Sequence, residues 1–155
     1  MGYHELTRAV KDLQKAPGTR FTIVKTVTSS AIPNNTQTGG ALTGAASGRL
    51  KLVDMVLQTG STGIVAPTNI EITTDNAKGL TGAAAPSALV AVSALGANKT
   101  IVVGFDASNE KVPLMLESGK KLFIHGDDAA GTGAGTMDVV MTFERIDQDA
   151  TIAAA

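Results

Sequence analysis

The chain has 155 residues, the length of one domain, and its 13 Lys+Arg against 14 Asp+Glu give a formal net charge of −1. This balance excludes a general attraction to nucleic acid or to anionic membranes, so neither is an expected partner. The sequence has no Cys, which excludes disulfides, thiolate metal sites and a cysteine nucleophile. The charged start lacks the apolar centre of a secretory signal, and we expect synthesis in the cytoplasm.

The first residues have the pattern of an amphipathic helix. Leu6, Val10 and Leu13 recur at helical spacing, which predicts a short helix over 4–14, or an arm that becomes helical on docking. Pro17-Gly18 would end it. We therefore treat residues 1–20 as an N-terminal arm.

From Phe21 onward the periodicity changes to that of β-strands, and β-branched residues become frequent. Turn signals separate about eight such segments, which predicts an all-β, jelly-roll-like antiparallel β-sandwich over residues 21–147. Residues 148–155 are predicted to form a flexible tail. The expected strands are 21–29, 48–60, 68–76, 87–95, 99–106, 112–117, 121–126 and 136–147.

The last strand shows the clearest alternation. Met137, Val139 and Phe143 would share the core face, while Asp138 and Glu144 would face outward. This assignment makes Val139 a predicted core residue.

Two strands are apolar on both faces, at 50–57 and 89–95. One face can enter the sandwich core, and the other needs a loop, a helix or a second subunit to cover it. Only 3% of the residues are aromatic, so large core anchors are scarce. We expect a homo-oligomer, with a trimer as the predicted state. The Gly- and Thr-rich segment 29–47 is either a solvated excursion or an interface loop.

Glycines at 131–136 read GTGAGT, but this run precedes a strand and no Lys follows, so we interpret it as a flexible hairpin loop without phosphate binding. His4 and His125 are the two histidines, too few for a cupin-type metal site. We interpret His125 as an exposed or hydrogen-bonded strand terminus.

Acidic residues offer no specific motif either. Asp127-Asp128 lacks the order of a calcium loop, so we interpret both as solvated turn acids. No Trp and a single Tyr leave few aromatic platforms for stacking on sugars. We predict no catalytic residue, no cofactor and no metal site. Carboxylates that could in principle pair for glycoside hydrolysis are Glu71, Glu110, Glu117 and Glu144.

Residues 48–79 and 117–155 resemble, in style and element order, the head decoration or cement proteins of tailed bacteriophages. The resemblance implies a jelly-roll or related sandwich that forms trimers and binds the major capsid protein. It also implies that the arm, residues 1–20, reaches the capsid lattice, with Leu6, Val10 and Leu13 as the contact residues. Loops 29–47 and 127–135 would add to the fit.

The expected function is therefore that of a non-enzymatic virion protein on the capsid surface, which stabilises the head. The alternative is a tail or head-fibre β-sandwich module that binds a receptor or a carbohydrate. A glycan array or the position of the gene among head or tail genes would separate the two.

Overall fold

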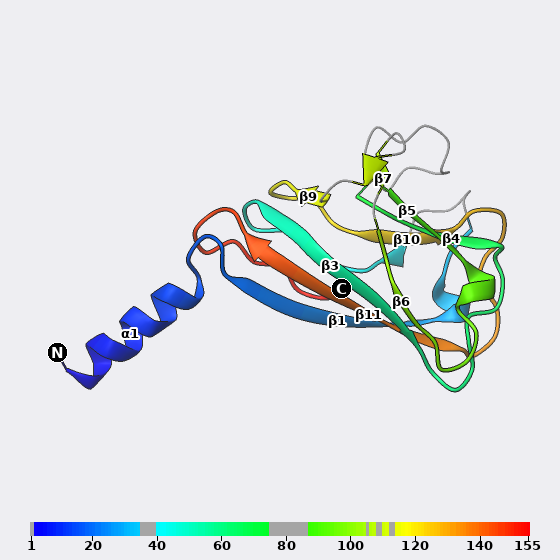
Figure 1. The fold of residues 1–155 in the computed structure, drawn as a ribbon, viewed down its shortest axis with the longest axis horizontal. Coiled ribbons are helices and arrows are strands. Elements are labelled where there is room, and N and C mark those ends of the chain that lie inside the picture. The colour runs from blue at the N-terminus through cyan, green and yellow to red at the C-terminus, as the bar shows by residue number, and fades with distance from the viewer. Residues whose placement is uncertain (1, 35–39, 75–86, 105, 108–109, 112–113) are drawn as a thin grey trace.

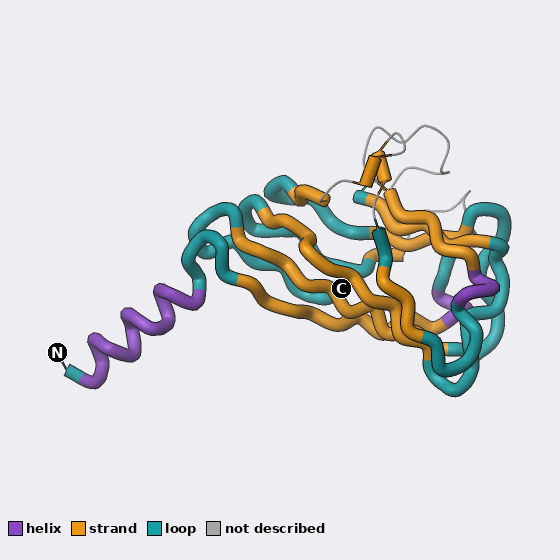
Figure 2. The backbone as a smooth tube through the Cα atoms, viewed as in Figure 1, coloured by secondary structure: helices purple, strands orange, loops and turns teal. Residues whose placement is uncertain are grey.

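A computed structural model describes residues 2–34, 40–74, 87–104, 106–107, 110–111 and 114–155. These residues form one α-helix, two short 3-10 helices and strands that build two antiparallel sheets (Figures 1 and 2). The elements are α1 (Tyr3–Gln14), β1 (Arg20–Thr28), η1 (Ser29–Ala31), β2 (Gly40–Ala41), β3 (Leu50–Thr59), β4 (Asn69–Thr73), β5 (Ser87–Ala91), η2 (Val92–Ala94), β6 (Thr100–Val102), β7 (Asp106–Ala107), β8 (Glu110–Lys111), β9 (Leu114–Leu116), β10 (Phe123–Gly126) and β11 (Thr136–Arg145).

The strand order is that of a jelly roll. The first sheet runs β1-β11-β3-β6, with β9 also paired to β3, and the second runs β2-β10-β4-β5-β7-β8. Eight strands pair as mirror partners along the chain: β1 with β11, β2 with β10, β3 with β6 and β4 with β5, all antiparallel. This is one long hairpin rolled up so that its strands divide between two sheets. The predicted fold class is confirmed.

The core lies between the two sheets, and β11 follows the predicted alternation. Met137, Val139, Met141 and Phe143 are fully buried, whereas Val140 between them is partly exposed. Aliphatic side chains from both sheets fill the remaining space, because the chain has few rings. The large side chains buried most completely include Ile32, Leu42, Leu50, Met55, Leu57, Ile70, Ile72, Leu95, Leu114, Leu116 and Leu122.

A bulge in β3 changes which of its residues face the core. The register between β3 and β11 shifts between Thr142 and Phe143, so one extra β3 residue, Val53, is left without a partner. Leu52 and Met55 are consequently both buried, although they lie three residues apart. The expectation that the large apolar residues of strand 50–57 are divided between both faces was wrong, since the bulge turns four of them inward and leaves Val56 on the outer face.

The segment 148–155, predicted as a flexible tail, is instead packed against residues 42–47. Ala150 and Ile152 are buried. The amide of Gly44 donates to the carbonyl of Ala153 at 2.9 Å, and that of Ser47 to the carbonyl of Thr151 at 2.9 Å. Burial of these two apolar side chains holds the segment against the sandwich.

The glycine run at 131–136 is also a packed connection. The amide of Gly131 donates to the carbonyl of Ile32 at 2.9 Å, and the amide of Ser29 donates to the carbonyl of Gly135 at 2.7 Å. A Cβ on Gly131 would lie 2.0 Å from the Ser29 oxygen, so the glycine permits a close backbone approach. The described part of 29–47 therefore contributes to the core and is not a solvated excursion; residues 35–39 lie outside the described ones.

Candidate partner-binding surface

Helix α1 forms where the sequence predicted a helix. Its first turn is capped by Glu5, whose carboxylate accepts a hydrogen bond from the amide of Gly2 at 3.0 Å. The chain leaves the helix through Lys15 and turns at Gly18, which has a φ of +82°. β1 begins two residues later, so the helix is joined to the edge of the first sheet.

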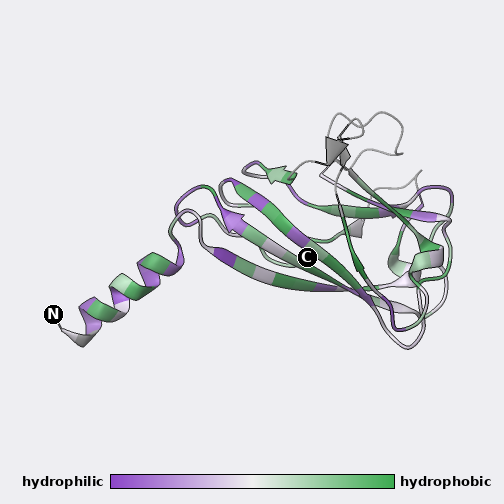
Figure 3. Cartoon of the chain, in the orientation of Figure 1, coloured by the Kyte–Doolittle hydropathy of each residue, from purple (hydrophilic) through white to green (hydrophobic). Residues whose placement is uncertain are grey.

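The apolar face of α1 is open to solvent. Leu6, Val10 and Leu13 are 54%, 46% and 69% exposed, and the helix extends away from the sandwich (Figures 1 and 3). The structure thus brings the three predicted contact residues onto one face without covering them. An isolated helix of 12 residues is only marginally stable in water, so this face gains most from a partner.

The base of α1 is held firmly to the sandwich. The Thr19 hydroxyl donates to the carbonyls of Ala16 at 2.7 Å and Gln14 at 3.2 Å, and it accepts a hydrogen bond from Nη1 of Arg145 at 3.1 Å. The guanidinium of Arg145 also lies over the ring of Phe21, 4.3 Å from its centroid. These contacts fix where the helix leaves the body.

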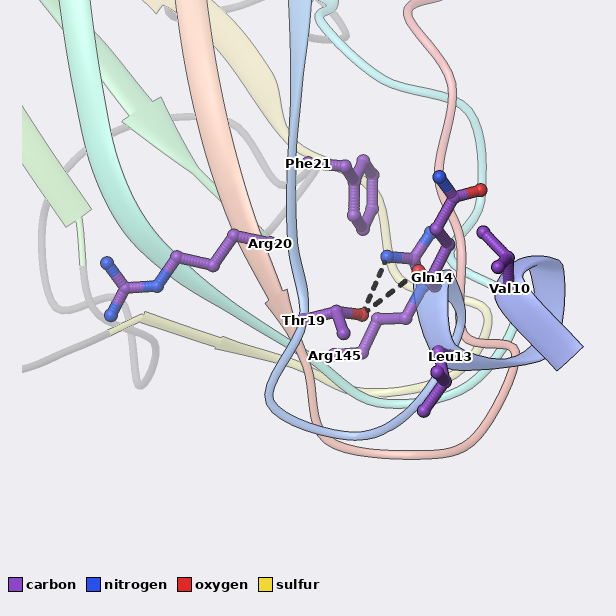
Figure 4. Close-up of a pocket in the computed structure, with 7 residues that line it drawn as sticks. All are labelled: Val10, Leu13, Gln14, Thr19, Arg20, Phe21 and Arg145. Atoms are coloured by element: carbon purple, nitrogen blue, oxygen red, sulfur yellow. Dashed lines mark hydrogen bonds between the residues drawn. The ribbon is translucent and has the colours of Figure 1, made fainter.

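A pocket of about 530 Å³ lies at this base (Figure 4). Val10 and Leu13 border it from the helix, and Phe21 and Arg145 border it from the sheet. The pocket offers an apolar wall with a cation at its edge, which suits an apolar side chain next to a carboxylate. Sequence reasoning missed Phe21 and Arg145 here, because only the pairing of β1 with β11 brings these distant residues together.

A buried pair of titratable residues lies in the second sheet. His125 of β10 is the register partner of Glu71 of β4, with Nε2 3.0 Å from Oε2, and both side chains are 1% exposed. The close contact with the Glu71 carboxylate raises the pKa of His125 above its ordinary value of 6.5, and burial opposes this shift. His125 was interpreted as an exposed or hydrogen-bonded strand terminus, and the structure contradicts the exposed alternative because the side chain is buried against Glu71. The pair is closed to solvent, so its geometry supports a structural role.

The other candidate acids whose side chains the structure describes lie in different parts of the fold. Glu144 lies on the first sheet and Glu71 in the second. Asp127 accepts hydrogen bonds from Asn69, and Asp128 accepts them from Thr68 at 3.0 and 2.8 Å, which lowers the pKa of Asp128. Among the residues that the structure describes, no three His, Asp or Glu side chains are arranged to hold a metal ion.

The fold and this surface define a jelly-roll protein with a protruding amphipathic arm. No family model, no curated protein and no solved structure matches the chain. In the described part of the chain, no helix has the length and apolar character that spanning a membrane requires.

Proposed function

We propose that this chain is a non-enzymatic virion subunit, a decoration or cement protein that binds the major capsid protein lattice and stabilises the head. The observation that carries this proposal is α1, which presents Leu6, Val10 and Leu13 to solvent while its base is anchored to the sandwich. An exposed apolar helix face is suited to docking in a groove of a partner.

Affinity from one arm would be modest. Full burial of one Leu or Val contributes roughly 1.5–3 kcal/mol before the cost of ordering the contact. Many copies on one particle would add their contacts through avidity, which is how weak single contacts can resist expansion of a shell. The pocket beside Phe21 and Arg145 would accept a side chain of the lattice next to the docked helix.

Polar substitution on the apolar face of α1 is expected to weaken binding. In the full chain, Leu6→Gln combined with Leu13→Gln should raise the apparent Kd for purified heads of the encoding phage at least tenfold, because about 1.4 kcal/mol corresponds to a factor of ten. Co-sedimentation with heads lacking the endogenous subunit measures this. Arg8→Gln is the matched control, since Arg8 is exposed on the opposite side of the helix.

Two results would contradict the proposal. Equal binding by the control and the double variant would show that α1 is not the anchor. If no form binds heads but the protein binds a glycan on an array, the receptor-binding alternative takes its place.

A further inference from the structure

Valines from four strands line up on the outer face of the first sheet. Val24 of β1 is the register partner of Val140 of β11. Val140 pairs with Val56 of β3, which pairs with Val102 of β6. This valine row crosses the sheet and is about 14 Å long at roughly 4.8 Å between strands. Its ends are open, since Val24 is 51% and Val102 72% exposed.

Polar side chains border the valine row on both sides. On one side, Thr142 pairs with Asp54, and on the other, Asp138 pairs with Gln58. Hydrogen bonds hold these borders in place: the hydroxyls of Thr22 and Thr142 lie 2.9 Å apart, and Thr26 donates to Asp138 at 2.6 Å. An apolar centre with an ordered polar rim is the usual anatomy of a protein interface.

A charged row lies beyond the rim, near the end of the sheet that carries α1. Arg20 of β1 pairs with Glu144 of β11, which pairs with Lys51 of β3. Nε of Arg20 is 3.0 Å from Oε2 of Glu144. The sign of charge therefore alternates across the sheet, and this pattern can complement a reversed copy of itself.

We infer that this face binds the same face of a second copy of the chain, around a two-fold axis that runs parallel to the strands between β11 and β3. Such an axis exchanges β11 with β3 and β1 with β6. Val140 then faces the partner's Val56, and Val24 faces the partner's Val102. The contact is self-complementary, as a two-fold interface must be.

Charge complementarity selects this axis. Glu144 faces the partner's Lys51, and symmetry forms this contact twice. The Thr142 hydroxyl can donate to the partner's Asp54, and the Gln58 amide to the partner's Asp138, so no like charges meet. A two-fold axis along the valine row would instead place the charged row against uncharged Thr28 and Thr136. Complementary charges fix the register of an interface.

The area of the face is sufficient for a dimer. Four strands cover roughly 19 Å, and the ten residues of β11 cover roughly 33 Å. Because β6 has only three residues, the footprint of β1, β11, β3, β6 and β9 is roughly 550 Å² on each copy, or about 1,100 Å² in total, just above the roughly 1,000 Å² that a specific interface needs. Two packed sheets cross at about 30°, and the long Lys51 side chain can follow the offset that this produces.

The dimer has a consequence for α1. A two-fold axis parallel to the strands leaves their direction unchanged, so both copies of β1 start at the same end. Both α1 helices then leave the dimer at that end, and one dimer presents two arms. This arrangement differs from the trimer expected from the sequence, and the mass in solution distinguishes them.

Charge exchange tests the inference. Light scattering after size exclusion should give twice the chain mass of 15.7 kDa for the wild-type chain. Lys51→Glu alone and Glu144→Lys alone should each raise the dimer Kd at least tenfold, because each places two pairs of like charges across the axis. An equimolar mixture of the two variants should restore the dimer, since the mixed pair has opposite charges at both contacts.

Lys121→Glu is the control, because Lys121 is exposed in the segment that leads into β10 of the second sheet, and the change should leave the dimer unchanged. Circular dichroism melting should show that all variants remain folded, since the changes are at the surface. A wild-type monomer at tens of micromolar, a trimer mass, or a mixture that stays monomeric would each overturn the inference.

Discussion

Replacing Val139 by Asp is expected to abolish cooperative folding. Val139 is fully buried between the sheets in the middle of β11, which pairs with β1 on one side and β3 on the other. The substitution removes the apolar side chain and places a carboxylate in the apolar interior, where the cross-strand neighbour Lys25 already donates to the carbonyl of Ala155. The free energy of unfolding of such domains is about 5–15 kcal/mol, and burying an unpaired charge removes a large part of it.

Val140→Asp is the matched control, because Val140 is the next residue and lies on the outer face of the same strand. We expect it to remain folded and to lose only the stabilisation that dimerisation adds, because it disrupts the valine row on the surface and leaves the core intact. Thermal unfolding followed by circular dichroism compares the two variants. An unchanged melting temperature for Val139→Asp would show that the core face of β11 is assigned wrongly.

Local alternation is enough to predict β11, and the reason is physical. A strand half-buried in a sandwich must alternate, and Met137, Val139 and Phe143 do so without interruption. In β3 the same rule fails, because the bulge contains one extra residue. Each β3 residue after the bulge therefore faces the side opposite to the one that strict alternation predicts. Leu52 and Met55 therefore share a face that a strict period of two assigns to only one of them.

Long-range register is what the sequence could not supply. Val24 and Val140 are ordinary strand residues until the pairing of β1 with β11 brings them together. The same holds for Glu71 and His125, which sequence reasoning treated as unrelated candidates. Short turns specify the pairing of consecutive strands, but a jelly roll pairs its first strand with its last. Surface sites built across such pairs are visible only in the folded chain.

Replacing His125 by Leu is expected to destabilise the fold by about 3–5 kcal/mol, since breaking a buried pair leaves an uncompensated charge. The Glu71 carboxylate would lose its contact at 3.0 Å, and its other oxygen, Oε1, already has no hydrogen-bond partner among the described residues. The double variant Glu71→Leu/His125→Leu should recover most of this loss, because apolar side chains of similar volume can replace a buried pair at little cost. Urea unfolding at about pH 6 measures all three forms.

The same pair should make stability depend on pH in one direction. Because contact with Glu71 raises the pKa of His125 in the folded protein, the folded state holds the proton more tightly than the unfolded state. The resulting stabilisation is complete below about pH 6.5 and is lost as the pH rises through the folded pKa. The free energy of unfolding of the wild type should therefore fall as the pH rises above about 6.5, and His4→Gln should show the same fall. In the double variant Glu71→Leu/His125→Leu this part of the fall should disappear, and its persistence would assign the pH dependence to other groups.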